Sequence, residues 1–289
     1  MSTTSADERP TGDPQSRTAR ARALAANAAG ESFGTFILVF FGVGSVMAAV
    51  ATGAQAGLWQ VAVVWAIGVS LAIYATAALS GAHINPAITL VAVVYDRMPL
   101  LQAGVYVLSQ LLGAMLAALV LYAMFAGTIE EFEHAHGLLR GGAGSELSAM
   151  MFGEYFPNPA VFGTDETAWR VVSIERAFIA EAVGTAVLAF MVGALTSERN
   201  MARPPAGSTA VIIGITVAAI ISIVAPLTQA ALNPARDLGP RIVAYFLGWG
   251  EVAIPGPRNG WLTVYVLAPF LGGIVGGGLQ RLLARLAPG

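Results

Sequence analysis

The sequence contains no cysteine and no lysine among its 289 residues, and only 11% of the residues are charged. The missing cysteines exclude disulfides, cysteine-ligated zinc and iron–sulfur clusters. Soluble domains carry roughly 25% charged residues, so the scarcity of charge argues against a soluble enzyme. The formal net charge of −2 provides no basic field for phosphate, which argues against a nucleic-acid partner. Hydrophobic residues are abundant instead, at 56%.

Long uncharged stretches indicate a membrane protein. Residues 32–95 contain no Asp, Glu, Lys or Arg, and a bilayer span needs about 20 apolar residues. Further uncharged stretches occur later in the chain. Together they predict six spans, at about 32–52, 59–79, 100–124, 176–196, 209–229 and 261–282. The sequence therefore predicts an all-α, multi-pass membrane protein.

The distribution of charge predicts the orientation of the chain. Arginines occur in the N-terminal segment, at Arg97, in the 197–205 loop and near the C-terminus, whereas the connection at about 127–172 is rich in Asp and Glu. Basic residues stay on the cytoplasmic side of a membrane. Both termini are therefore expected in the cytoplasm, with the chain in the cell (inner) membrane.

The chain repeats itself at an offset of about 150 residues. Residues 31–40 (ESFGTFILVF) recur as 181–190 (EAVGTAVLAF), and residues 80–90 (SGAHINPAITL) recur as 228–238 (TQAALNPARDL). Each copy holds three spans, an odd number, so the second copy must lie inverted relative to the first. The predicted organisation is a disordered cytoplasmic tail over 1–27 and a single domain over 28–285, divided into repeat one (about 28–126), an outer loop (about 127–172) and repeat two (about 173–285).

Two apolar segments, at about 80–96 and 230–248, are too short to span a bilayer, and each contains Asn-Pro-Ala. Asparagine is a good N-cap and proline suits the first helical position, so Asn85 and Asn233 predict two re-entrant half-helices that meet at the midplane. Each side-chain NH₂ has two donors. Four donors and two positive helix ends would then repel a cation there and bind a neutral hydroxyl. A third Asn-Pro-Ala, at Asn158, lies in the outer loop and out of register.

These motifs resemble those of the aquaporin and aquaglyceroporin (major intrinsic protein) family over about residues 28–285, and bacterial glycerol uptake facilitators most of all. The resemblance implies an aquaporin-like inverted repeat, a homotetramer in the lipid bilayer, and a channel rather than an enzyme, without a cofactor or a bound metal. It places Asn85 and Asn233 at the midplane constriction. It also assigns a selectivity filter, formed by Trp65, Ile221, Ala230 and Arg236.

The resemblance further implies a solute. Asp237 follows the filter arginine, and Arg241 lies four residues later, as in glycerol facilitators. These facilitators usually have Gly and Phe where this chain has Ile221 and Ala230, and the substituted set is similar to the filters of some plant channels. We therefore expect passive passage of glycerol, similar small neutral solutes and water. A water-selective channel and one that passes urea or metalloid hydroxides are the alternatives.

Two carboxylates lie inside predicted spans, at Glu31 and Glu181. We expect each to accept backbone N–H groups from the unwound residues before a half-helix; the alternative is proton coupling in a secondary transporter. Asp237 is assigned structural support, and His83 a structural hydrogen bond rather than a protonation gate. Backbone carbonyls of the unwound residues are expected to line the pore, at Gly81, Ala82, His83, Gln229, Ala230 and Ala231.

Overall fold

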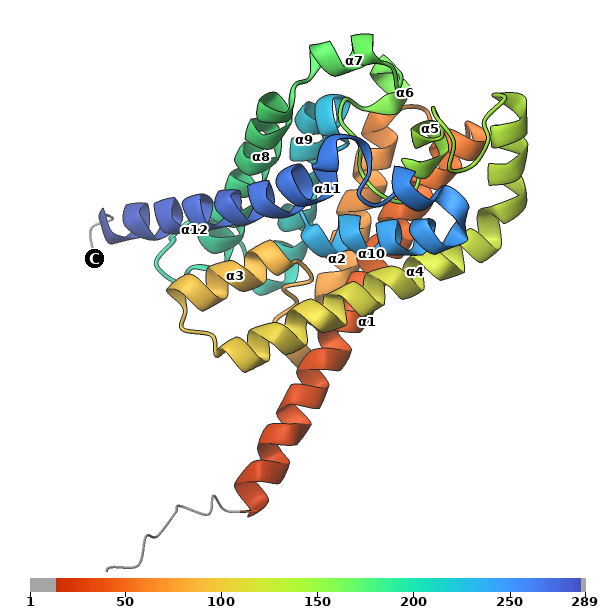
Figure 1. Cartoon of the computed structure of the whole chain (residues 1–289). Coiled ribbons are helices and arrows are strands. Elements are labelled where there is room, and N and C mark those ends of the chain that lie inside the picture. The colour runs from red at the N-terminus through yellow and green to blue at the C-terminus, as the bar shows by residue number, and fades with distance from the viewer. Residues whose placement is uncertain (1–13, 287–289) are drawn as a thin grey trace, which may run out of the picture.

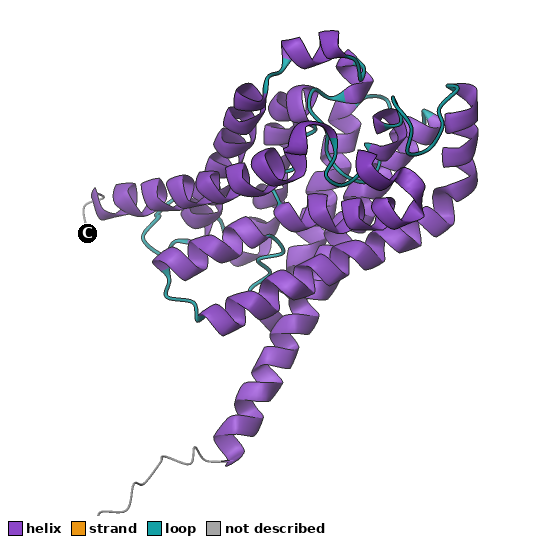
Figure 2. Cartoon of the chain, viewed as in Figure 1, coloured by secondary structure: helices purple, strands orange, loops and turns teal. Residues whose placement is uncertain are grey.

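The computed structural model describes residues 14–286, which form helices and loops and no strand (Figure 2). Six helical segments of this range are long and apolar enough to cross a membrane. They are α1 (Pro14–Thr52), α2 (Leu58–Ser80), α4 (Leu100–Ala135), α8 (Ile174–Thr196), α9 (Ala206–Thr228) and a final segment, Pro257–Leu286, that includes η3 (Pro257–Asn259), α11 (Gly260–Leu262), η4 (Thr263–Leu267) and α12 (Ala268–Leu286). The prediction of six spans is confirmed.

Two short helices begin at the prolines of the in-register Asn-Pro-Ala motifs. They are α3 (Pro86–Tyr95) and α10 (Pro234–Ala244), the latter continuing through η1 (Tyr245–Trp249) and η2 (Gly250–Val252). Figure 1 shows α3 and α10 between α12 and α4. The first packs on α12 of the second repeat and the second on α4 of the first repeat. The two repeats therefore interlock through their half-helices, as the predicted inverted repeat requires.

Glycines allow the long helices to approach closely. A Cβ atom at Gly113 of α4 would collide with the carbonyl oxygen of Ser32 in α1, and one at Gly272 of α12 would collide with that of Ala182 in α8. Small residues at a helix crossing permit this backbone contact in membranes. A glycine contact of the same kind thus joins α1 to α4 in the first repeat and α8 to α12 in the second.

The N-terminal part of α1 differs from expectation. Residues 14–27, placed in a disordered tail by the sequence analysis, are helical. Alanine and arginine dominate this stretch and are strong helix formers, so the helix continues past the apolar span. Figure 1 shows it projecting from the body of the molecule. Residues 1–13 of the predicted tail lie outside the described residues.

The outer loop is folded rather than extended. Helix α4 runs to Ala135, and three short helices follow: α5 (Glu146–Ala149), α6 (Pro159–Phe162) and α7 (Glu166–Val171). The third Asn-Pro-Ala caps α6, with the Asn158 side chain accepting from the Ala160 N–H at 3.0 Å. The motif therefore performs the same local capping at the surface, on a helix of four residues.

Candidate functional site

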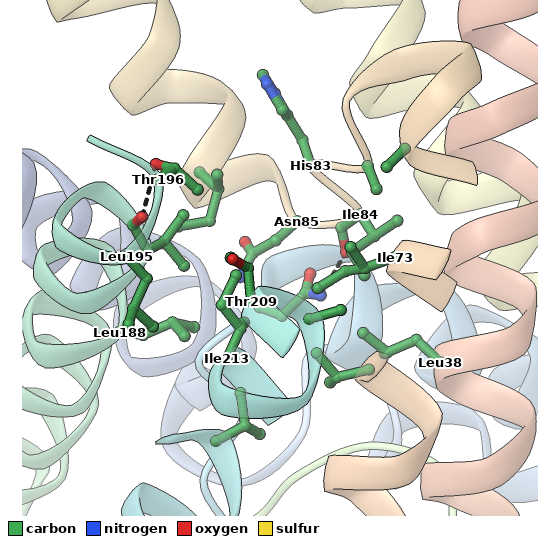
Figure 3. Close-up of a pocket in the computed structure, with 18 of the residues that line it drawn as sticks. Leu38, Ile73, His83, Ile84, Asn85, Leu188, Leu195, Thr196, Thr209 and Ile213 are labelled. Atoms are coloured by element: carbon green, nitrogen blue, oxygen red, sulfur yellow. Dashed lines mark hydrogen bonds between the residues drawn. The ribbon is translucent and has the colours of Figure 1, made fainter. Parts of the chain in front are cut away.

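One cavity of about 840 Å³ is bordered by both repeats. Its lining includes the predicted filter residues Trp65, Ile221, Ala230 and Arg236. Asn85, Asn233 and the stretch Arg203–Ala206 also line it. Figure 3 shows Leu188 and Leu195 on one side of this space and Leu38 and Ile73 on the other, with Asn85 and Thr209 between them. The cavity thus connects the residues that the sequence analysis brought together.

The two asparagines that are predicted at the midplane each cap one half-helix and bind the opposite repeat. Asn85 accepts from the Ala87 N–H at 2.8 Å, and Asn233 accepts from the Ala235 N–H at 3.1 Å. The Asn85 amide donates to the Leu232 carbonyl at 3.0 Å. The Asn233 amide donates reciprocally to the carbonyl of Ile84 at 2.8 Å.

These cross-links change the number of donors available at the midplane. Each side-chain NH₂ has two N–H groups, and one of each pair is used by a carbonyl of the other repeat. Two donors, not the four that the sequence analysis expected, are therefore left for a solute. The sequence gives no sign of this loss, because the acceptors Ile84 and Leu232 lie about 150 residues from their donors.

Glu31 and Glu181 hold the unwound segments that precede the half-helices. Glu31 is fully buried and accepts from His83 N at 2.9 Å and Ile84 N at 2.7 Å, as well as from two side chains, Ser80 and Gln110. Glu181 is also fully buried. It accepts from the backbone N–H groups of Ala231 and Leu232 at 3.0 and 2.9 Å, and from the Thr228 hydroxyl. Both carboxylates are thus fixed by several donors, which favours a structural role over proton coupling.

The unwound segments have an alternating backbone. Ala82, Ile84, Ala230 and Leu232 all have positive φ angles, of 52°, 44°, 63° and 55°. Because the N–H groups of these segments bond to Glu31, Glu181 and nearby hydroxyls, their carbonyls are not used by a helix. In the described chain, those of six residues accept no hydrogen bond: Gly81, Ala82, His83, Gln229, Ala230 and Ala231. All of them border the cavity except Gln229, so the prediction that Gln229 lines the pore is wrong. They remain free to accept from a passing hydroxyl.

The predicted filter arginine lies against the predicted filter tryptophan. The guanidinium carbon of Arg236 is 4.5 Å from the centre of the Trp65 ring, and the Arg236 side chain is only 3% exposed. A Cβ atom at Gly42 would collide with that ring, so glycine at this position lets the tryptophan sit there. Arg236 also donates from Nη1 to the Phe152 carbonyl at 3.0 Å, and its Nη2 forms an ion pair with Glu154.

Comparison with known proteins identifies this arrangement. The model of the major intrinsic protein family matches residues 18–279. The chain belongs to the major intrinsic protein family. It is 40% identical over 262 residues to the glycerol uptake facilitator protein of Haemophilus influenzae, covering 90% of this chain and 94% of that one. It is 37% identical over 262 residues to a propanediol uptake facilitator of Citrobacter freundii, with 90% and 92% covered.

A solved structure supports the fold of this major intrinsic protein. The aquaglyceroporin from Plasmodium falciparum superposes with a TM-score of 0.76, covering 91% of this chain and 100% of that one. Its sequence identity is 23%, so the likeness concerns the fold alone. The predicted aquaporin-like architecture is therefore confirmed.

Two residues that contact the predicted filter arginine were not predicted from the sequence. Phe152 and Glu154 come from the outer loop, to which the sequence analysis assigned no role. Glu154 is 1% exposed, and apart from the Arg236 ion pair its carboxylate oxygens have no hydrogen-bond partner in the described chain. One sequence signal existed: Glu154 is the only charged residue between Glu146 and Asp165.

Asp237 and Arg241 fasten the same loop in this major intrinsic protein. Asp237 accepts from the Glu154 N–H at 2.6 Å and from Arg241 Nε at 3.0 Å. Arg241 then donates to the carbonyls of Glu154 and Ala253. Asp237, predicted as structural support, lies in a buried network that joins α10 to the outer loop, and its supporting role stays a prediction.

The burial of Glu154 makes stability depend on pH. Burial raises the pKa of its carboxyl from near 4.5 to about 8, against the lowering effect of Arg236. The folded protein therefore binds this proton more tightly than the unfolded chain, and its stability falls as pH rises from about 4.5 to about 8. We expect the melting temperature in detergent to fall across this window, and Glu154→Gln to reduce the fall.

The matched control is Glu166→Gln, because Glu166 is an exposed carboxylate of the same loop. This variant should keep the pH profile of the wild type. Each pKa unit corresponds to about 1.4 kcal/mol, so the contrast is measurable. Parallel profiles for the wild type and Glu154→Gln would contradict the linkage.

Proposed function

We propose that the chain is a passive membrane channel for glycerol and similar small neutral solutes, together with water. The observation that carries this proposal is the filter, where the Trp65 ring, the aliphatic Ile221 and the Arg236 guanidinium border one cavity. A polyol has a carbon side, which can pack on the ring and the aliphatic chain, and hydroxyls, which can accept from arginine. The glycerol uptake facilitators at 38–40% identity support the same solute.

Electrostatics in the cavity favour neutral solutes. The N-terminal ends of α3 and α10 meet where Asn85 and Asn233 form their cross-links. Each end carries roughly half a positive elementary charge, and Arg236 adds a full charge at the filter. A cation or a hopping proton therefore meets two successive barriers, as in other pores that use an arginine and half-helix dipoles.

A diol with a methyl group is the second solute that we propose. Ala230 is small where a filter of this kind usually carries an aromatic ring, so the opening has one planar wall rather than two. Such a filter can accept a methyl beside a hydroxylated chain. The propanediol uptake facilitator at 37% identity supports this extension.

Ala230→Phe is expected to narrow the filter and to slow propanediol more than water. Ala230 lines the cavity and is 5% exposed, so a ring at this position takes up space at the filter. Fitted sites discriminate roughly 10–200-fold for one extra carbon, so we expect propanediol flux to fall by about tenfold. Ala54→Phe, on the exposed α1–α2 connection, is the control. Faster propanediol passage in Ala230→Phe would contradict the assignment of Ala230 to the filter.

We also propose the assembly and orientation of the channel. Each protomer of a homotetramer would provide its own path, both termini would face the cytoplasm, and the protein would lie in the cell (inner) membrane. Support for the orientation comes from the arginine distribution and from the ion pair of Arg281 with Asp96, which puts these two charges at the same membrane face. No enzymatic role is proposed.

Uptake of labelled glycerol into proteoliposomes tests passive conduction. The flux is expected to be unaffected by a protonophore and to rise linearly through low millimolar glycerol. A secondary transporter coupled through Glu31 or Glu181 would instead lose its gradient-driven flux and would saturate. Saturating, protonophore-sensitive uptake would therefore overturn the proposal.

A further inference from the structure

The side chain of Gln229 bridges two main-chain groups of the outer loop. Its Oε1 accepts from the Tyr155 N–H at 2.8 Å, and its Nε2 donates to the Met150 carbonyl at 3.1 Å. Because one partner is a donor and the other an acceptor, the amide has a single matched orientation. The loop between these two residues, which we call the arch (residues 150–155), is thereby closed at its base.

The arch lies directly against the filter arginine. The Phe152 carbonyl, in its middle, accepts from Arg236 Nη1 at 3.0 Å, and the Glu154 carboxylate forms the ion pair with Nη2. Gln229 is not among the residues that line the cavity, whereas the next residue, Ala230, is. Gln229 therefore lies outside the cavity and is connected to Arg236 only through the arch.

The backbone at Gln229 does not require this side chain. Gln229 has φ 65°, a left-handed conformation that glycine adopts at least cost. The equivalent position of the first repeat is Gly81, with φ 81°. The second repeat thus carries a long amide where the first has no side chain, and that amide makes the two bonds that close the arch.

We propose that Gln229 is a positioning residue that latches the arch onto Arg236 and so limits the size of the solutes that pass. This inference rests on the proposed function. With the latch closed, the Phe152 carbonyl holds the guanidinium against the Trp65 ring. With the latch open, the arch and the guanidinium gain freedom, and the filter admits longer polyols.

Gln229→Gly removes the latch without disturbing the fold. Glycine is the residue at the equivalent position of the first repeat, and it readily adopts the observed left-handed backbone. In proteoliposomes we expect the permeability ratio of erythritol to glycerol to rise by about three- to tenfold. A fitted site discriminates roughly 10–200-fold between substrates that differ by one methylene, and loss of the latch should remove part of that discrimination. Gln229→Glu keeps the acceptor and loses the donor, so its ratio should be intermediate. Arg97→Gly is the matched control, because Arg97 is exposed and also has a left-handed backbone (φ 59°).

Hydrogen exchange of the peptide that contains Tyr155 provides a readout that needs no solute. The Tyr155 N–H should exchange faster in Gln229→Gly than in the wild type, and at the wild-type rate in Arg97→Gly. Unchanged exchange would overturn the latch, and faster exchange with an unchanged solute ratio would overturn its effect on size selection. Failure of wild-type vesicles to conduct glycerol would instead reject the proposed function, while the exchange result would still decide whether the latch exists.

Discussion

Arg236→Ala is expected to open the pore to cations and to larger solutes while glycerol continues to pass. The Arg236 side chain is buried at the proposed filter, 4.5 Å from the Trp65 ring centre, and it is held by the Phe152 carbonyl and by Glu154. Its removal deletes a positive charge and several donors at once.

Ion and solute fluxes of the same vesicles measure this effect. Each 1.4 kcal/mol removed from a barrier raises a rate about tenfold, so we expect cation leakage to rise by about that factor or more. The positive ends of α3 and α10 remain at the midplane, so the leak should stay below that of an open pore. Arg236→Lys keeps the charge and loses the planar fork, so it should retain ion exclusion but alter polyol selection.

Arg199→Ala is the control, because Arg199 is exposed on the loop before α9. This variant should behave as the wild type in every flux. Unchanged ion exclusion and unchanged solute preference in Arg236→Ala would show that Arg236 does not control the filter.

Glu181→Ala is expected to abolish the folded protein. The carboxylate satisfies two backbone N–H groups, of Ala231 and Leu232, and the Thr228 hydroxyl, all of them buried. A buried donor left without a partner costs about 1–3 kcal/mol. Three such donors cost an amount comparable with the whole stability of a typical protein, about 5–15 kcal/mol.

Recovery of monodisperse protein from detergent, together with its melting temperature, measures this effect. Glu181→Gln keeps one acceptor oxygen and should be partly recovered, with glycerol flux per folded protomer close to that of the wild type. Glu198→Ala is the control, since Glu198 is 91% exposed and its contact with Arg203 is 3.9 Å long. A wild-type yield of Glu181→Ala would contradict the supporting role, and loss of flux in well-folded Glu181→Gln would revive proton coupling.

The spans and half-helices were predictable because their determinants are local. A long stretch without charged residues predicts a membrane span. An Asn-Pro pair such as Asn85-Pro86 predicts the start of a helix, because asparagine caps it and proline suits its first position. The third motif, at Asn158, obeys the same rule on a short surface helix. The inverted arrangement was predictable from the repeat at an offset of about 150 residues, because two copies with three spans each must lie inverted in the membrane.

The contacts of the site were less predictable because they join distant segments. The reciprocal bonds of Asn85 and Asn233 depend on two carbonyls of the opposite repeat. The contacts of Glu154 and Gln229 depend on how the outer loop folds back over α10, and loops of this kind carry no periodic pattern. Most residues that line the cavity, and the supports Glu31, Glu181 and Asp237, were therefore predictable, whereas Phe152 and Glu154 were not, and Gln229 was wrongly expected to line the pore.

Stopped-flow light scattering on proteoliposomes tests the central claim most directly. Vesicles are mixed first with sucrose and then with glycerol as the osmolyte. The account predicts fast shrinkage in sucrose and, in glycerol, fast reswelling at a rate well above that of empty liposomes. Fast shrinkage in sucrose without reswelling in glycerol would mean a water-selective channel and would contradict the proposed glycerol path.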